Sequence, residues 1–395
     1  MSDKPQMIPR DPQTEKEIRE FFAEQRKLRK VVATTRTRSG QELDWVPIES
    51  QLPGGVPAPP PPHAAGVAHP GATLTRFELD EQPEARGPAG TVPILRYDTG
   101  RAYSARGMRG LLAKNPPPLR DGGFAGAPGA PTATQTKAYC TAATNQRPNY
   151  GCQGTLNIWS PYVGYSDNLS LSQIAEGGGA GANFQGVEAG WLVYGDVNGD
   201  WSPHLFTYFT TCGYTQSGDY LGGYNRAVGG WVQISPSIFP GAALTPSTPN
   251  GPQAEIVLRY TLRNGGWWLS VNGSWIGYYP TGLFNAAGIA VSAASHSFYG
   301  EVGDAHDPPG TPGLQMGSGV NPALHDASVC CYQRNLLSQL QPDTWNLANF
   351  LPDWTDQTNP YCYRLVPHYL DTGAWGSYCY LGGPGMVVTA QQAAG

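Results

Sequence analysis

The sequence contains no lysine after residue 137, since all six of its lysines lie in the first 137 residues. That first part holds 19 basic and 15 acidic residues, so its net charge is about +4. The rest of the chain holds 6 basic and 15 acidic residues, so its net charge is about −9, and the two parts add to the −5 of the whole chain. Few basic residues in the larger part argue against nucleic acid as the main partner. The shift predicts a boundary between residues 1–137 and 138–395. The basic part could dock on the acidic part, with release at low pH, or remain a solvated tail.

Long apolar runs are also missing. No run approaches 18 residues, so we expect no segment that spans a membrane. The N-terminus lacks the apolar stretch of a signal peptide. Only 14% of the residues are charged, whereas glycine (51) and proline (37) are frequent. This composition indicates a turn-rich β protein.

Several motifs of common enzyme classes are absent. No C-x-x-C pair occurs and the histidines are scattered, so we expect no metal. No G-x-S-x-G elbow is present, which argues against a serine hydrolase. The glycine run at 177–181 lacks a following G-K-[ST], so phosphate binding is not expected either. The sequence therefore predicts an activity that needs no cofactor.

All seven cysteines lie in the acidic part, as expected for disulfides formed in an oxidising compartment. Cys140 and Cys152 are the nearest pair and the best candidates for a local disulfide. The distribution favours a secreted protein, whereas the N-terminus argues against export. Localisation stays open at this point.

The N-terminal part has few regular elements. Residues 14–32 carry an apolar stripe after Thr14, with Glu17 three residues on, and predict one helix with a capping box. Short strands are expected at 42–48 and 90–97. The proline-rich stretch 53–70 predicts an extended linker outside any sheet.

Beyond Ala138, short runs rich in β-branched and aromatic residues alternate with turn residues. Asn264-Gly265 and Asn272-Gly273 are typical of hairpin turns. The pattern predicts an all-β fold, an antiparallel β-sandwich or jelly roll. The expected strands are 156–159, 188–194, 205–211, 231–234, 255–262, 267–271 and 275–279.

Glutamates are rare in this β-rich part: Glu176, Glu188, Glu255 and Glu301. Glu188 stands among apolar and aromatic neighbours in VEAGWLVY (187–194), and Glu301 stands in FYGEV (298–302). A partly desolvated carboxyl can hold or exchange a proton near working pH, which suits general acid and base work. The alternative is a structural, hydrogen-bonded glutamate. The tryptophans, ten of eleven beyond Lys137, could line a groove for proline rings or sugars, or pack in the core.

Ordered motifs across the acidic part resemble the neprosin family of glutamic prolyl endopeptidases. They include LSLSQI, VEAGWLVY, LFTY, GWWL, IGYYP, YGEV, QMGSG and WGSYCY, spread over roughly 155–385. The resemblance implies a catalytic β-sandwich with a Glu188/Glu301 dyad that activates water. It also implies cleavage after proline and an inhibitory pro-region at 1–137, for which 115–137 is the expected processing region. The chain departs from the family pattern at Gly195 and at 297–299, which bears on proline specificity.

From these features we expect the substrate groove to include Trp191, Tyr194, Tyr208 and Tyr299. The expected partner is a proline-containing peptide or protein, and the protein is expected to be a monomer. Two alternatives remain open. One is a non-catalytic Trp-rich sandwich that binds carbohydrate or peptide. The other is a glycoside hydrolase, because two carboxylates about 5–5.5 Å apart also serve retaining glycoside hydrolysis.

Overall fold

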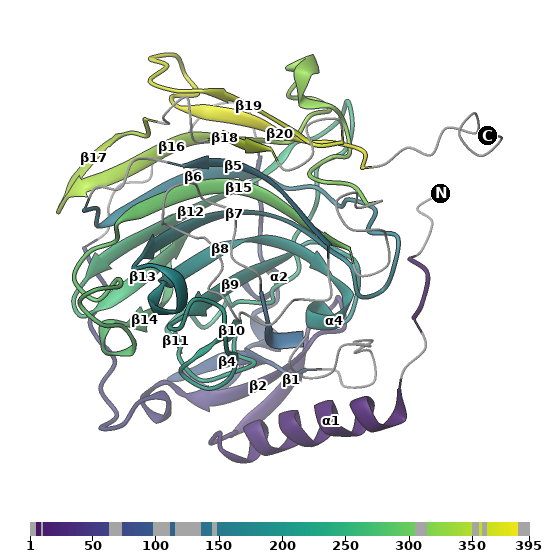
Figure 1. The fold of residues 1–395 in the computed structure, drawn as a ribbon. Coiled ribbons are helices and arrows are strands. Elements are labelled where there is room, and N and C mark those ends of the chain that lie inside the picture. The colour runs from purple at the N-terminus through teal and green to yellow at the C-terminus, as the bar shows by residue number, and fades with distance from the viewer. Residues whose placement is uncertain are drawn as a thin grey trace.

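Two large curved β-sheets packed face to face form the body of the protein (Figure 1). This computed structural model confirms the predicted all-β, sandwich-like fold. It describes residues 5–8, 11–62, 73–97, 111–114, 136–143, 148–304, 314–349, 355–357 and 362–385. Of the helices in these ranges, none combines the length and the apolar composition needed to cross a membrane.

The first sheet has seven antiparallel strands and carries the two glutamates of interest. Its central strands β7, β8 and β15 are buried along their whole length, because both faces of the sheet are covered. In spatial order the strands are β10 (Gly222–Tyr224), β9 (His204–Thr210), β8 (Gln185–Tyr194), β7 (Leu169–Gly178), β15 (Ser295–Asp304), β5 (Thr136–Ala143) and β18 (Thr355–Gln357).

The second sheet is larger. In spatial order its strands are β11 (Val232–Gln233), β14 (Ser274–Pro280), β13 (Gly266–Val271), β12 (Ala254–Arg263), β6 (Gly151–Asn157), β16 (Tyr332–Gln341), β20 (Tyr378–Gly382) and β19 (Arg364–His368). β17 (Thr344–Leu347) pairs with β16, and β3 (Thr73–Leu74) pairs in parallel with β12.

Both predicted hairpin turns are confirmed. Asn264 and Gly265 have φ values of 46° and 74° between β12 and β13, and Asn272 and Gly273 have 49° and 85° between β13 and β14. Two successive left-handed residues are what a type I′ turn requires, which explains the Asn-Gly sequence at both positions.

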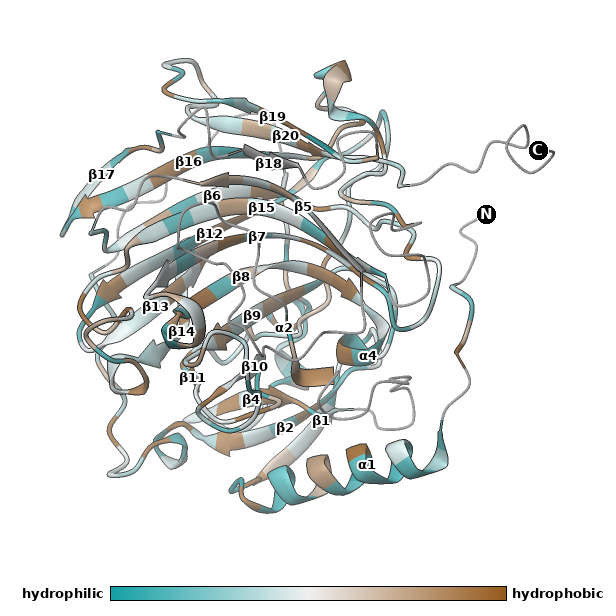
Figure 2. Cartoon of the chain, in the orientation of Figure 1, coloured by the Kyte–Doolittle hydropathy of each residue, from teal (hydrophilic) through white to brown (hydrophobic). Residues whose placement is uncertain are grey.

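The space between the sheets holds the main hydrophobic core. Ile174 and Phe298 from the first sheet meet Leu258 and Leu336 from the second in this cluster. Figure 2 shows apolar residues recurring along the central strands of both sheets. Strand alternation therefore directs one set of side chains into the core and leaves the other set on the outer face of each sheet.

The N-terminal part packs against this sandwich as a helix and a small sheet. Helix α1 (Pro12–Lys27) precedes the antiparallel strands β1 (Ala33–Arg36), β2 (Glu42–Pro47) and β4 (Thr91–Leu95), so the two strands expected here are confirmed. Other helices with bounds inside the described ranges are short: η1 (Ile48–Gln51), α2 (Glu78–Glu81), η2 (Pro83–Ala85), η3 (Gly181–Asn183), α4 (Gly195–Asn198), η4 (Thr281–Leu283) and η5 (Pro322–Leu324).

Helix α1 is present, but its predicted ends are wrong. Asp11 is the N-cap, because its carboxylate accepts a hydrogen bond of 2.8 Å from the Thr14 backbone N–H. Pro12 at the first helical position has the backbone angle that a helix start needs. The helix ends at Lys27, and the chain is in strand β1 by Ala33. Thr14 therefore lies inside the first turn and forms no capping box with Glu17.

The proline-rich stretch forms no strand over residues 53–62, as predicted. It lies along the second sheet, where the Ala58 N–H donates to the Tyr278 hydroxyl at 2.9 Å and the Pro59 carbonyl accepts from Asn264 at 2.9 Å. The rest of the predicted linker, 63–70, is outside the described residues. The predicted processing region is likewise outside them from 115 to 135.

The N-terminal part covers the outer face of the first sheet. Ile18 and Phe22 of α1 belong to one buried cluster with Leu192 and Tyr194 of β8. Trp45 of β2 joins the core cluster of the sandwich itself. Apolar packing therefore joins the two parts of the chain.

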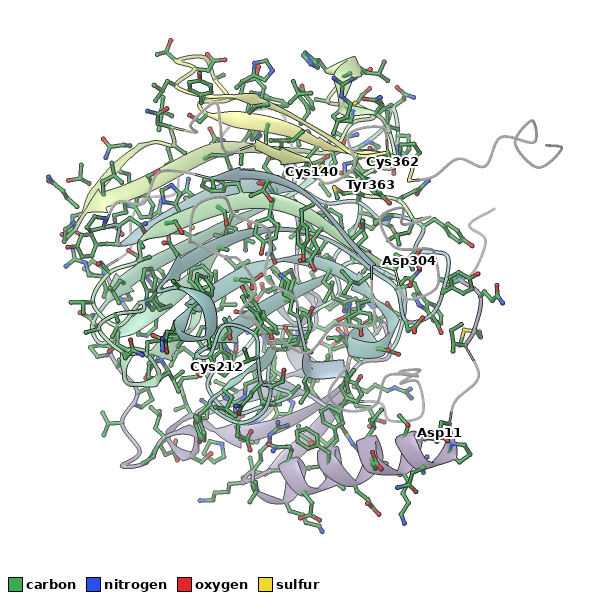
Figure 3. The ribbon with its side chains drawn as sticks, in the orientation of Figure 1. Asp11, Cys140, Cys212, Asp304, Cys362 and Tyr363 are labelled. Carbon is green, nitrogen blue, oxygen red and sulfur yellow. The ribbon has the colours of Figure 1, made fainter. Side chains whose placement is uncertain are left out.

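No disulfide bond joins Cys140 and Cys152, so the predicted pair is not formed in this structure. Cys140 lies on β5 of the first sheet, whereas Cys152 lies on β6 of the second, with its Sγ 3.9 Å from the Ala175 carbonyl oxygen. Figure 3 shows Cys140 and Cys212 far apart in the molecule. Nearness in sequence did not bring the predicted pair together, because their strands belong to different layers.

Candidate active site

Glu188 and Glu301 lie on the outer face of the seven-stranded sheet, on strands separated only by β7. In the register of the sheet, Glu188 is opposite Ala175 of β7 and Glu301 is opposite Leu171. Gln173 and Tyr299 are opposite each other in this register, at a position along the strands between the Ala175 and Leu171 pairs. The structure therefore brings together the two glutamates that the sequence singled out, and both are buried.

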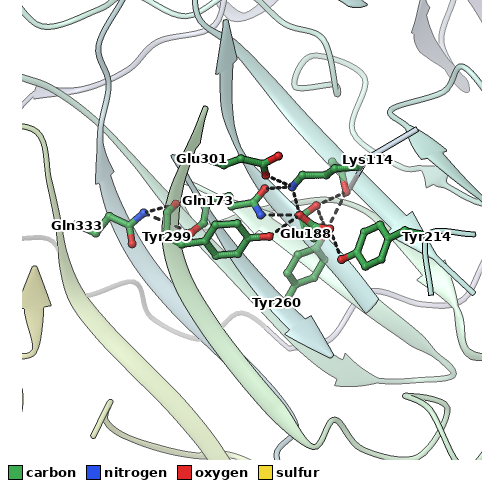
Figure 4. Close-up of polar contacts among 9 residues, drawn as sticks. Lys114, Gln173, Glu188, Tyr214, Tyr260, Tyr299, Glu301 and Gln333 are labelled. Atoms are coloured by element: carbon green, nitrogen blue, oxygen red, sulfur yellow. Dashed lines mark hydrogen bonds and ion pairs between the residues drawn. The ribbon is translucent and has the colours of Figure 1, made fainter. Parts of the chain in front are cut away.

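Neutral donors surround the Glu188 carboxylate (Figure 4). Gln173 Nε2 donates to Oε2 at 2.5 Å, and the Tyr299 hydroxyl donates to the same oxygen at 2.9 Å. The Tyr214 hydroxyl donates to Oε1 at 2.8 Å. Three such hydrogen bonds stabilise the ionised carboxylate and fix its orientation.

The two tyrosines remain donors over the whole working range of pH. Burial raises the pKa of Tyr214 and of Tyr299 well above the ordinary value, and the charge of Glu188 raises both further. Tyr214 reaches the site from the turn after β9, with a φ of 62° that is uncommon outside glycine. The backbone is held as well, since the Glu188 carbonyl accepts from Thr207 Oγ1 and the Tyr260 hydroxyl, each at 3.0 Å.

Lys114 of the N-terminal part inserts its ammonium group between the two glutamates (Figure 4). Its Nζ forms a close ion pair with Glu188 Oε2 and an ion pair of 3.2 Å with Glu301 Oε2. It also donates to Gln173 Oε1 at 2.8 Å. The lysine side chain is fully buried. The Gln173 amide thus donates to the Glu188 carboxylate and accepts from the Lys114 ammonium group.

Aromatic rings enclose this ion triad. The Lys114 Nζ lies 5.4 to 5.8 Å from the ring centres of Phe206, Tyr208 and Tyr299, within the range of cation–π attraction. On the Glu301 side, burial raises the pKa of Tyr139 well above its ordinary value, and the charges of Glu301 and Glu188 add to the effect. The site therefore excludes water around two carboxylates and one cation.

Three of the four expected groove residues lie with the glutamates: Tyr299 in direct contact, and Tyr208 and Tyr194 in the aromatic cluster of the same face. Trp191 does not, which corrects its expected place in the groove. It points between the sheets, where its indole N–H donates to the Asn157 carbonyl at 2.9 Å. Because Trp191 is three residues from Glu188 on one strand, the two side chains take opposite faces.

Two glycines next to the motifs have different roles. A side chain at Gly190 would clash with the Ser172 carbonyl and with Gln173, so this glycine leaves room for the Gln173 side chain. At Gly300 a side chain would meet Leu381 and Met316 of the core instead. The space at Gly300 therefore serves packing between the sheets.

Sequence reasoning missed Lys114, Gln173 and Tyr214. The alternation of side chains along residues 169–174 could have identified Gln173, because Gln173 lies on the same face of its strand as Ala175, the residue opposite Glu188. Lys114 offered a weaker signal. It is a single lysine that follows the apolar residues Leu111 and Leu112, in a region whose other basic residues are arginines and which is rich in proline. In the described ranges, no group of three or more histidine, cysteine or acidic side chains is placed to hold a metal ion.

Comparison with solved structures gives weak likenesses only. A tetrameric galectin from the ball sponge Cinachyrella sp. matches at 14% identity with a TM-score of 0.23, over 41% of this chain and 85% of that chain. CG-16, a homodimeric agglutinin from chicken liver, matches at 9% identity with a TM-score of 0.21, over 42% and 92%. Both scores are too low to support an argument about fold or function.

The model of the neprosin family matches residues 166–384, more than half of the chain. This span contains Glu188, Glu301, Gln173, Tyr214 and Tyr299, whereas Lys114 precedes it. The match supports a peptidase-type activity in general. The protein belongs to the neprosin family.

Proposed function

We propose that the protein is a glutamic endopeptidase in which Glu188 and Glu301 activate water for attack on a peptide bond. The observation that carries this proposal is the pair of buried carboxylates that face one cation on one side of a sheet. Without that cation, two ionised carboxylates in a buried site repel each other, so one of them takes up a proton. One proton shared by two carboxyls is the state in which one acts as base and the other as acid.

The hydrogen bonds around Glu188 support its role as the base. Gln173, Tyr214 and Tyr299 all donate to it and favour the ionised form. Glu188 removes a proton from the attacking water. Glu301, in the protonated form, polarises the scissile carbonyl and then supplies the proton that the leaving amine needs.

The aromatic outer face supports a peptide substrate with an apolar ring at the cleavage position. Tyr194 and Tyr208 pack there around Tyr224, with ring centres 6.3 and 4.8 Å from that of Tyr224. Flat apolar rings such as that of proline pack well on aromatic faces. We therefore propose cleavage after proline, as the family resemblance implies.

The test compares Glu188→Gln and Glu301→Gln with the wild type on a quenched proline-containing peptide at pH 3 to 5, after acid treatment. Each proton-transfer role is worth roughly 10²- to 10⁴-fold in rate, so each variant should lose about that much of kcat. Glu176→Gln is the matched control, because Glu176 is a buried glutamate of β7 that points to the opposite face. It should keep wild-type kcat. Full activity in the Glu188→Gln or Glu301→Gln variant would remove that residue from the mechanism.

A further inference from the structure

We propose that the cavity between helix α1 and the sandwich binds a small organic anion, an apolar carboxylate whose head group contacts Arg29 and Arg226. The cavity has a volume of about 640 Å³. Small-molecule sites typically measure roughly 300–1,000 Å³. The described residues that line the cavity include neither Glu188 nor Glu301. The inference therefore goes beyond the proposed function and does not depend on it.

Both parts of the chain form the wall of this cavity. The N-terminal part contributes residues of α1 and of its small sheet, such as Phe22 and Leu95. The sandwich contributes Val197 of α4 and residues 224–227, which begin at the last residue of β10. Small-molecule sites occur preferentially where two structural units meet. The position of the cavity is therefore one at which a ligand is expected.

The lining of the cavity carries mostly positive charge. Among the described residues that line it are six basic side chains and one carboxylate, that of Asp44. Asp44 is already bound, because Arg26 donates to its two oxygens at 2.6 and 3.1 Å and Thr34 donates to it at 2.8 Å. Three more basic side chains are exposed and form ion pairs with glutamates: Arg19, Lys27 and Arg96.

Arg29 and Arg226 differ from these four, because neither forms an ion pair with a carboxylate of the described residues. The Arg29 guanidinium donates to the Arg226 carbonyl, so the two residues are in contact. Arg226 donates to Gln51 Oε1 at 2.8 Å and to the Trp231 carbonyl. Each guanidinium has more N–H donors than these contacts use. Both arginines therefore keep donors for a ligand in the cavity.

Two neighbouring cations in a partly buried place favour the binding of an anion. Burial, and after it the charge of Arg29, lowers the pKa of Arg226 to about 9. Burial also lowers the pKa of Arg29, while the charges of Asp44 and Asp219 oppose this effect. An anion in contact with both groups would offset their loss of hydration and their mutual repulsion. A carboxylate suits them because its two oxygens match the planar fork of a guanidinium.

Asn225 adds a neutral donor to the same wall. Its side chain is buried, with 7% of the residue exposed, and its Oδ1 accepts from the Thr207 backbone N–H at 3.0 Å. Among the described residues, none accepts a hydrogen bond from its amide nitrogen. A φ of 51° places Asn225 in the left-handed region, which asparagine adopts more readily than most residues. An amide and two guanidiniums thus supply the polar part of the site.

The rest of the wall is apolar, which favours an organic anion over an inorganic one. The rings of Phe22 and Tyr97 stack with centres 3.9 Å apart and planes tilted by 9°. Leu111 and Leu112 also line the cavity. A ligand with an apolar chain would remove this surface from water, which is favourable. Inorganic sulfate or phosphate would use only the polar donors.

The experiment measures binding of octanoate to the full chain at pH 7 by isothermal titration calorimetry. The wild type should bind about one octanoate per chain. Arg29→Met and Arg226→Met should each weaken binding at least about tenfold, which corresponds to about 1.4 kcal/mol. Arg76→Met is the matched control and should bind like the wild type, because Arg76 is exposed and does not line the cavity. Octan-1-ol lacks the charge and inorganic sulfate lacks the chain, so each should bind at least about tenfold more weakly than octanoate.

Ala23→Trp tests the place of the site. Ala23 of α1 is exposed and lines the cavity, so a larger side chain fills the space without changing any charge. This variant should also bind octanoate at least about tenfold more weakly. Absence of saturable binding to the wild type, or unchanged affinity in Arg29→Met, would refute the site. Equal affinity for octan-1-ol or sulfate would refute an apolar carboxylate as its ligand. Should Arg226→Met not fold, Arg29→Met and Ala23→Trp decide the outcome.

Discussion

Removing the Tyr299 hydroxyl should move the acid limb of the pH–rate profile to higher pH. The hydroxyl donates to Glu188 Oε2 at 2.9 Å in a buried site, so Tyr299→Phe removes one hydrogen bond to a charged group. Such a bond is worth about 1.5–3 kcal/mol, and about 1.4 kcal/mol corresponds to one pH unit. The ionised base becomes less stable, and the limb should rise by about 1–2 pH units.

The assay is kcat/KM of the acid-activated protein against pH, because this ratio reports the essential base of the free enzyme. Tyr214→Phe should act in the same direction, since Tyr214 donates to the other oxygen of Glu188 at 2.8 Å. Tyr208→Phe is the control, because its ring lies on the same face and the described hydrogen bonds of Glu188 do not include its hydroxyl. An acid limb that stays in place in both Tyr299→Phe and Tyr214→Phe would refute Glu188 as the base.

Two further predictions concern stability. Glu255→Gln should lower the free energy of unfolding by about 3–5 kcal/mol in urea titration, because it leaves Arg334 buried without the carboxylate that it now binds at 2.6 and 2.7 Å. A loss below about 1 kcal/mol, typical of exposed pairs, would contradict this. Glu176→Gln should gain stability relative to the wild type between pH 4 and pH 7. Burial raises the pKa of Glu176 well above its ordinary value. The stability that the protonated Glu176 gives to the wild type is therefore complete only below the pKa of the unfolded chain, about 4.3, and is lost as the pH rises. A constant difference between the two proteins over that range would show that folding does not raise the pKa of Glu176.

Local sequence determined the parts of the fold that depend on neighbours along the chain. Asn264-Gly265 and Asn272-Gly273 specified their turns, because only such residues take two left-handed conformations in succession. The β-rich runs specified an all-β sandwich, and the motifs around Glu188 and Glu301 identified the family. The ends of helix α1 were mispredicted because Asp11 and Thr14 are both good caps, and Pro12 favoured the earlier start.

Tertiary structure alone decided which distant groups meet. The register of β7, β8 and β15 sets Glu188 beside Gln173 and Tyr299, and strand alternation turns Trp191 away into the core. Cys140 and Cys152, twelve residues apart in the chain, were separated by the division into two sheets. Lys114 gave almost no sign in the sequence, because a lysine acquires its meaning from the charges that surround it. Only the packing of the N-terminal part on the sheet brought its ammonium to both carboxylates.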